Sequence, residues 1–257
     1  MSDRVRIRLL SISLIIGFFL LWEILCIMLD VSDLVVPRPS AILVTMYDRF
    51  PVLWPHILQT LSSTLIGFVL GVTIGVTLGV IVGTSKVAYA VAYPLLVGFS
   101  SIPKVAVVPI FVLWFGSGTT PAILTAMVIC VFPIVVNIAT GLATTEPELE
   151  DVLKTMGASK TEILWNVGLP RAMPYFFASL KVAITLAFVG AVLSETVASN
   201  KGIGFVMMAA SSNFQVTLVF AGLILLAIMG VVLYALFSLL ERRITGWATR
   251  GNDIAIT

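Results

Sequence analysis

Long uncharged stretches alternate with short charged segments along this sequence, and the uncharged stretches predict where its membrane spans lie. Three stretches contain no Asp, Glu, Lys or Arg: 36 residues from Phe50 to Ser85, 41 from Val105 to Thr145 and 39 from Gly202 to Leu240. A helix needs about 20 apolar residues to cross a bilayer. Each stretch is therefore long enough for at least one membrane span.

The boundaries of the apolar runs predict an all-α protein, a polytopic membrane helical bundle in a single transmembrane domain over residues 1–257. The expected spans number about six, from the length that a bilayer requires. They cover residues 9–29, 57–83, 87–116, 119–141, 172–195 and 216–240. The proline-rich residues 30–56 are expected to connect the first two spans outside the cytoplasm and to contain a short amphipathic helix over residues 40–50.

The third expected span contains three prolines and must be kinked or interrupted. An interrupted helix is tolerated at membrane depth where it lines a cavity. Its centre combines freed backbone groups with the hydroxyls of Ser100 and Ser101 and the ammonium of Lys104. We therefore place a candidate translocation pathway here. The alternative for Lys104 is a stem buried in the bundle with its amine reaching the lipid headgroups.

Three further polar residues lie in or next to expected spans. Asn137 is added to the candidate pathway, while the simpler role for its amide is a hydrogen bond between helices. Glu195, also added, is either an interfacial carboxylate or a gate residue. Glu23 should face protein or water rather than lipid, and its simplest role is to bind a partner within the bundle.

The second expected span carries a glycine at every fourth position. Such a stripe allows another helix to approach closely, because helices in lipid associate through packing. The sequence does not decide between a dimer contact and a neighbour in the same chain. The stripe consists of Gly67, Gly71, Gly75, Gly79 and Gly83.

Residues 146–170, here called the elbow, form a long polar segment that predicts two short helices with a corner between them. Thr145 and Glu148 have the spacing of a capping box for the first helix, and Gly157 supplies its end. A side chain at that glycine would penalise the left-handed turn that the corner needs. The corner is therefore encoded locally.

The second helix of the elbow also carries start and stop signals. Ser159 and Glu162 form a second capping box just after the glycine. Leu169-Pro170 is expected to break the helix before the fifth span begins.

The spacing within the elbow resembles the cytoplasmic EAA loop of binding-protein-dependent ABC importer permeases. Asp151-Val152-Leu153 is followed after three residues by Gly157, and nine residues later by Val167-Gly168-Leu169-Pro170. The family usually has Glu-Ala-Ala where this chain has Asp-Val-Leu. The resemblance continues from about residue 35 onward, through Ser101-Ile102-Pro103-Lys104-Val105 and Leu113-Trp114-Phe115-Gly116, and is strongest for the nitrate, sulfonate and taurine branch.

The resemblance implies a type I importer fold in which the elbow docks as a coupling helix on an ATPase subunit. It also implies two copies of the permease, two ABC ATPase subunits and an extracytoplasmic binding protein that delivers a small solute, such as a sulfonate, taurine, nitrate, an aromatic acid or a vitamin precursor. The residues expected to couple to the ATPase are Asp151, Val152, Leu153, Gly157, Ala158, Ser159, Val167, Leu169 and Pro170.

The chain itself is expected to be non-catalytic and to bind no cofactor. Its sequence contains no GxxxxGK[ST] motif, so ATP and Mg should bind to the partner ATPase. Cys26 and Cys130 stand alone in apolar runs and His56 is the single histidine, so neither a metal site nor a catalytic constellation is expected.

Composition and charge agree with a multi-pass protein of the bacterial inner membrane. Hydrophobic residues make up 59% and charged residues 11% of the chain, and the mean hydropathy is +1.11. A net charge of +2 is too small to indicate nucleic-acid binding. The expected topology places ten basic residues on the side of the elbow and three in outer loops. The positive-inside rule then puts the elbow and both termini in the cytoplasm.

A second function class remains open on the residues alone. Glu23, Lys104 and Glu195 could form an ion or proton path in a secondary transporter or channel that works without ATPase subunits. The elbow argues against this class, because such a carrier has no need of it.

Overall fold

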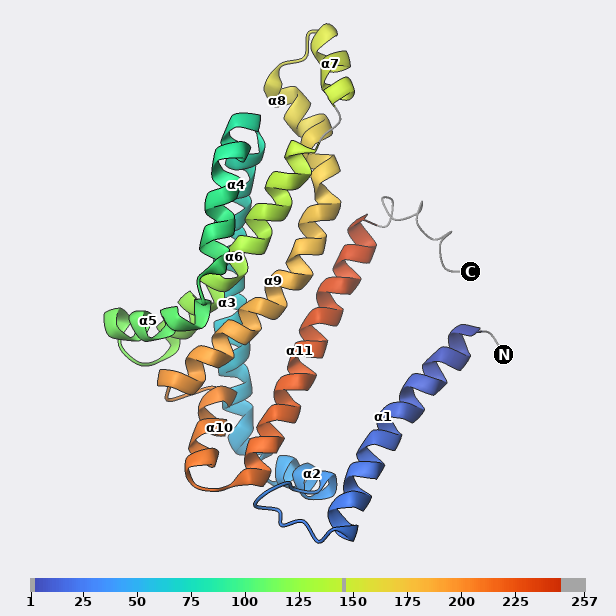
Figure 1. The fold of residues 1–257 in the computed structure, drawn as a ribbon, viewed down its shortest axis with the longest axis vertical. Helices are drawn as coiled ribbons and strands as arrows, with labels where there is room; N and C mark the ends of the chain where they lie inside the picture. Colours follow the sequence, from blue (N-terminus) through green and yellow to red (C-terminus); the bar gives the residue numbers. More distant parts are fainter. Residues whose placement is uncertain (1–2, 145–146, 246–257) are drawn as a thin grey trace.

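The protein was analysed as a computed structural model, which describes residues 3–144 and 147–245. The described residues form helices joined by short connections, shown in Figure 1. Five helices are long and apolar enough to cross a membrane, or six if a bent pair counts as one span. The expected all-α membrane bundle is therefore confirmed. The helices are α1 (Asp3–Met28), α2 (Pro39–Asp48), α3 (Phe50–Gly83), α4 (Lys86–Ser101), α5 (Val108–Phe115), α6 (Thr119–Ala143), α7 (Pro147–Thr155), α8 (Lys160–Ile163), α9 (Leu169–Ala198), α10 (Ile203–Ser212) and α11 (Val216–Thr245).

The glycine stripe of α3 packs against α6 of the same chain, which decides the alternative left open by the sequence. A Cβ atom at Gly67 would lie 2.6 Å from the Ala126 Cβ, and one at Gly79 would lie 2.8 Å from the Ile138 Cβ. The residue numbers of the contacting pairs increase in the same direction along both helices, so α3 and α6 run parallel. The chain between them must therefore return across the membrane.

That return crossing is the broken helix predicted around Ser100–Lys104. The segments Val87–Ser101 and Lys104–Phe115 are bent by 77° at the break. Lys104–Val107 form a 3₁₀ turn between α4 and α5, and α5 projects sideways from the bundle in Figure 1. The Gly118 N–H then donates to the Ala198 carbonyl oxygen (3.0 Å), which places the start of α6 beside the end of α9.

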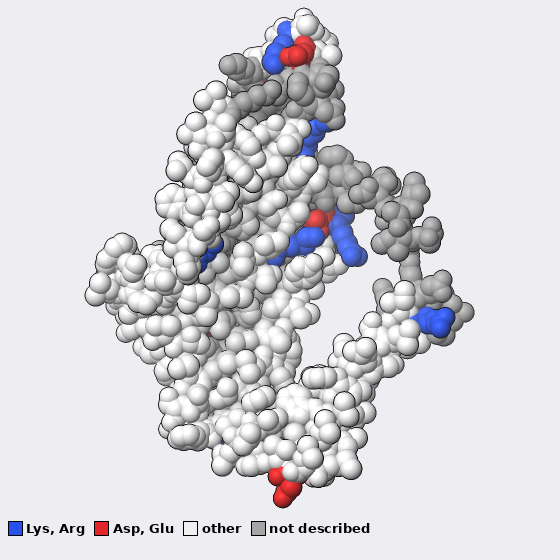
Figure 2. Space-filling model, in the orientation of Figure 1, with Lys and Arg blue, Asp and Glu red and all other residues white. Residues whose placement is uncertain are grey.

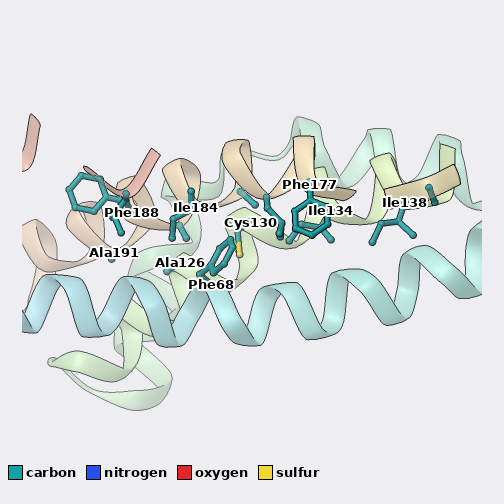
Figure 3. Packing of buried hydrophobic residues seen from close by; sticks show 14 of the residues in the cluster. Phe68, Ala126, Cys130, Ile134, Ile138, Phe177, Ile184, Phe188 and Ala191 are labelled. Carbon is teal, nitrogen blue, oxygen red and sulfur yellow. The ribbon is translucent and has the colours of Figure 1, made fainter. Parts of the chain in front are cut away.

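The core lies where α3, α6 and α9 meet (Figure 3). Phe68 from α3 lies beside Cys130 and Ile134 from α6 and Phe177 and Ile184 from α9. α6 and α9 run antiparallel and approach closely at small residues: a Cβ at Gly141 would lie 3.3 Å from the Ala172 Cα. The close contacts come from packing, which is the main source of helix association in lipid.

The first helix is joined to the rest at its outer end. The Glu23 carboxylate accepts hydrogen bonds from the Ser40 backbone N–H (3.0 Å) and the Ser40 hydroxyl (2.7 Å) at the start of α2. The Trp22 ring lies 6.0 Å from Phe220 of α11. A carboxylate at a helix N-terminus is favourable, because the free N–H groups and the helix dipole attract it. Glu23 therefore has the bundle partner that we expected.

Several boundaries differ from those predicted. α3 begins at Phe50 rather than at residue 57, because Pro51 lies in its first turn and Pro55 is accommodated inside the helix. α11 continues to Thr245, five residues beyond the expected end. α10 was not predicted: Gly202 ends the preceding turn with φ +102°, and an apolar helix follows it.

Candidate functional site

The corner of the elbow has the left-handed turn predicted at Gly157. Its φ is +86°. Its N–H donates to the Lys154 carbonyl oxygen (3.0 Å), and the Ala158 N–H donates to the Leu153 carbonyl oxygen (3.0 Å). These two bonds form the Schellman motif that ends α7. No other group lies within 4 Å of a Cβ built at Gly157, so the constraint there is conformational rather than steric.

The second capping box is also present. The Ser159 N–H and hydroxyl donate to the Glu162 carboxylate at 2.7 and 2.8 Å, and the Glu162 N–H donates back to the Ser159 hydroxyl at 3.3 Å. The box predicted for the first helix, Thr145 with Glu148, lies outside the residues whose side chains are described. α8 therefore starts where the sequence places it.

The predicted break at Leu169-Pro170 is wrong. A π-helical segment, Leu164–Gly168, connects α8 directly to α9. Pro170 lies in the first turn of α9, directly after the π-helical segment, and the helical run passes through it. The elbow is consequently continuous with a membrane-spanning helix, without a flexible joint at the proline.

The elbow exposes apolar side chains together with charges. Val152, Met156 and Trp165 have exposed fractions of 56, 77 and 67%. Asp151 and Lys154, both exposed, pair at 3.2 Å within α7. In Figure 2 charged side chains gather over the elbow at one end of the molecule, and most of the surface between it and the opposite end is uncharged. An exposed apolar and charged surface of this kind is suited to a protein partner.

Lys104 holds the end of the broken helix α4. Its Nζ donates to the Ser100 carbonyl oxygen (3.2 Å) and lies 5.7 Å from the centre of the Phe132 ring of α6. The Ser100 and Ser101 hydroxyls both donate to the Val97 carbonyl oxygen, at 2.8 and 3.1 Å. A cation at a helix C-terminus offsets the negative end of the dipole. The three residues thus come together, and all three bind backbone carbonyl groups of α4.

Asn137 does not join this group and makes no hydrogen bond across helices that the structure describes. Its amide donates to the Pro133 carbonyl oxygen (2.8 Å) within α6. The possible structural role between helices is therefore not supported. Asn137 remains half-buried, so its side chain is not part of the close-packed core.

Glu195 lies apart from the other candidates, near the outer end of α9. It is 2% exposed. One carboxylate oxygen, Oε2, accepts hydrogen bonds from the Thr60 hydroxyl (2.8 Å) and the Gly204 N–H (3.2 Å). It is thus a buried carboxylate that binds three helices together, α3, α9 and α10, rather than an interfacial one. The glycine-rich turn before α10 was the available signal for this contact, but the sequence does not reveal its partner.

Sequence reasoning also missed an ion pair. Lys181 of α9 and Glu241 of α11 are 2.6 Å apart, with 22 and 19% of their side chains exposed. Glu241 directly follows the last long uncharged run, and Lys181 lies inside the expected fifth span. The pair joins α9 to the end of α11 about 18 Å along α9 from Leu169, at 1.5 Å per residue.

Comparison with known proteins supports this architecture. Residues 71–246 match the family described as "binding-protein-dependent transport system inner membrane component". A probable ABC transporter permease protein of Haemophilus influenzae is 33% identical over 89% of this chain and 94% of its own length. The riboflavin transport system permease protein RibX of Chloroflexus aurantiacus is 39% identical over 76% of this chain and 73% of its own. The taurine transport system permease protein TauC of Escherichia coli is 25% identical over 93% of this chain and 89% of its own length.

A solved structure agrees on the fold. A chain of the methionine ABC transporter MetNI, in an inward-facing conformation, superposes with a TM-score of 0.65 at 20% identity, covering 75% of this chain and 97% of that one. The family match decides between the two function classes that the residues left open. This chain belongs to the binding-protein-dependent transport system inner membrane components and is a multi-pass permease of the ABC importer family.

Proposed function

We propose that two copies of this permease assemble with two ABC ATPase subunits and that the elbow is the surface on which each ATPase docks. The observation that carries this proposal is the continuity of the elbow with α9, through α8 and the π-helical segment. The exposed Val152, Met156 and Trp165 supply an apolar docking surface. ATP and Mg bind to the ATPase subunits, and this chain catalyses no reaction.

In this mechanism, closure of the ATPases around ATP pushes the elbow as a rigid body. The Gly157 turn fixes the angle between α7 and α8, and the Ser159–Glu162 box fixes the start of α8. Because α9 follows without a break, displacement of the elbow rocks α9 together with α6, which packs closely on it. Access to the pathway then switches from one side of the membrane to the other.

The orientation proposed for the chain places the elbow and both termini in the cytoplasm. In Figure 1 the start of α1 and the end of α11 point toward the half of the molecule that carries α7 and α8, and α2 and α10 lie at the other end. The ten-to-three distribution of basic residues supports the same direction. An extracytoplasmic binding protein would deliver solute to the end with α2 and α10.

The solute is proposed to be a small organic or inorganic anion, such as a sulfonate, taurine, nitrate or an aromatic acid, or a vitamin precursor. The names of the relatives, which include taurine and riboflavin transport permeases, support this range. Lys181 is paired with Glu241, whereas no carboxylate among the described residues pairs with Lys104. Lys104 is therefore the better candidate for binding an anion in the pathway, together with Ser100, Ser101 and the half-buried Asn137. Glu195, which is 2% exposed, is left out of the proposed pathway.

Affinity purification from the native membrane in mild detergent tests the assembly. We expect a P-loop ATPase to co-elute and to hydrolyse ATP, and we expect replacement of Gly157 by Val or of Asp151 by Ala to reduce its recovery. A matched control is Thr155→Ala on the same exposed helix, since the Thr155 hydroxyl bonds only the Val152 carbonyl oxygen behind it. An oligomer of this chain that is free of ATPase would contradict the proposal.

A further inference from the structure

The start of α10 is held by side chains from two other helices. Three successive backbone N–H groups, which a helix N-terminus leaves without partners in its own helix, each bind a side chain from α3 or α9. The bonds run from the Gly202 N–H to His56 Nδ1 (3.0 Å), from the Ile203 N–H to Thr60 Oγ1 (2.9 Å) and from the Gly204 N–H to Glu195 Oε2 (3.2 Å). We call these six residues the outer clasp.

The hydrogen bonds of the clasp are interlocked rather than separate. The Thr60 hydroxyl accepts from the Ile203 N–H of α10 and donates to the Glu195 carboxylate of α9. Both side chains are almost completely buried, with 0 and 2% exposed. A hydrogen bond between buried groups is costly to lose, because it leaves a donor or an acceptor without a partner. Sliding of any one of the three helices against the other two would break this set.

Two glycines make the clasp sterically tight as well. A Cβ at Gly202, where φ is +102°, would collide with the Glu195 carboxylate. A Cβ at Gly204 would lie 2.7 Å from the Val192 carbonyl oxygen and 2.8 Å from the Glu195 Cβ. The first turn of α10 therefore rests directly on α9, and the Glu195 carboxylate lies against its backbone.

The other end of α9 is the elbow. Figure 1 shows α9 running from α8 at one end of the molecule to α10 at the other. From Leu169 to Glu195 the helix advances about 39 Å at 1.5 Å per residue. A displacement applied at the elbow thus reaches Glu195 through one helix.

We propose that Glu195 is a positioning residue of the transport cycle: it makes α10 and the outer part of α3 move with α9, so that the outer end of the pathway follows the elbow. This proposal rests on the proposed docking of an ATPase at the elbow. Glu195 contacts neither solute nor nucleotide in this role. A clasp that merely stabilised the fold would leave the movement of α10 unchanged once the protein is folded, and this difference can be measured.

The test uses the complete importer with its ATPase subunits in lipid nanodiscs, with Cys26 and Cys130 replaced by Ala. Nitroxide labels are placed at Val197 on α9 or at Met208 on α10, which are 56 and 47% exposed. Distances between equivalent labels of the two copies are measured without nucleotide and with MgATP and vanadate. In the parent protein we expect both label pairs to shift. In Glu195→Ala we expect the Val197 shift to remain and the Met208 shift to be lost.

Two further variants keep the test decisive if Glu195→Ala does not fold. Thr60→Val removes the hydroxyl that links α3, α9 and α10, and we expect it to weaken the Met208 shift; Thr60→Ser keeps the hydroxyl and should restore it. Thr64→Val is the matched control, because the Thr64 hydroxyl is equally buried but bonds only the Thr60 carbonyl oxygen of its own helix.

The outcomes separate the two proposals. A Met208 shift that persists in every folded clasp variant would overturn the role of Glu195 while leaving the elbow proposal intact. A parent protein that assembles with no ATPase, or whose Val197 labels do not respond to nucleotide, would instead remove the proposed function and this inference with it.

Discussion

The core is held together by contacts between distant parts of the sequence, whereas the elbow is held by local hydrogen bonds. The core joins α3, α6 and α9 through contacts between residues far apart in sequence, such as Gly67 with Ala126. The elbow is held by bonds between residues three to five positions apart, such as Ala158 to Leu153 and Ser159 to Glu162. The core is buried, whereas the elbow exposes Met156 to 77%.

Because the core and the elbow are built differently, substitutions in them should affect different properties: the stability of the fold and the proposed coupling to the ATPase. A change in the core removes packing that holds three helices together, so it should lower the free energy of unfolding. A change in the elbow alters a short local motif and an exposed surface, so it should leave most of the stability intact and act on the proposed ATPase contact. Four substitutions test this separation, in order of the expected loss of stability.

The largest effect is expected from Gly71→Ala in the α3–α6 contact. The added Cβ would collide with the Cys130 sulfur and lie 3.0 Å from the Met127 carbonyl oxygen. We expect a loss of about 2 kcal/mol, within the range for overpacked cores, in the free energy of unfolding measured in mixed micelles. Gly98→Ala in α4 is the control: no atom lies within 4 Å of its Cβ, so it should stabilise by about 0.5 kcal/mol through helix propensity. Equal effects at the two sites would contradict the packing argument.

The next effect is expected from Lys181→Met, which removes the ammonium group that pairs with Glu241. Because the pair is about four-fifths buried, the loss should be roughly 1–2 kcal/mol, below the range for fully buried pairs. A double-mutant cycle with Glu241→Gln measures the coupling between the two side chains. A coupling energy near zero would show that the pair does not hold α11 to α9.

Gly157→Val is expected to cost about 1 kcal/mol through the left-handed backbone alone, since no neighbouring group obstructs the side chain. The prediction has two readouts: a small decrease in the free energy of unfolding and a clear loss of ATPase recovery or of its hydrolysis rate. Gly157→Asn is the control, because Asn tolerates this conformation better than Val does. A variant that binds and drives the ATPase normally would count against the role of the corner.

The smallest change in stability is expected from Asp151→Ala. Its pair with Lys154 is exposed, with 71% of the Asp151 side chain accessible, so the loss should stay below about 0.5 kcal/mol. Recovery of the ATPase should nonetheless fall, if this carboxylate contacts the partner. A large loss of stability would place Asp151 in the fold rather than at the docking surface.

Local signals in the sequence predicted the local structure. The glycine corner and the Ser159–Glu162 box need only residues within one turn of each other, and both are present. The proline break near Lys104 also appears, because missing N–H groups and ring clashes act within the helix itself. The length of the apolar runs was sufficient to predict a membrane protein, because a span is likewise a property of one continuous stretch of sequence.

Partners distant in the sequence were not predictable in this way. The glycine stripe indicated a close helix contact but not α6 as its partner. Thr60 and Glu195 are separated by 135 positions, and neither carries a signal that selects the other. The Leu169-Pro170 prediction failed because the helical run passes through Pro170 by way of the π-helical segment before it, and the sequence carries no clear signal for that segment.

The π-helical segment Leu164–Gly168 also fixes the direction in which the elbow faces. A π turn holds one residue more than an α turn, so it rotates everything before it by about 100° around the helix axis, given 3.6 residues per α turn. The face of α9 that packs into the core and the face of α8 that meets solvent are therefore set independently. Removing a single residue here would leave the membrane part of α9 in register and rotate the elbow, with the docking surface proposed on it, by about 100° relative to the core.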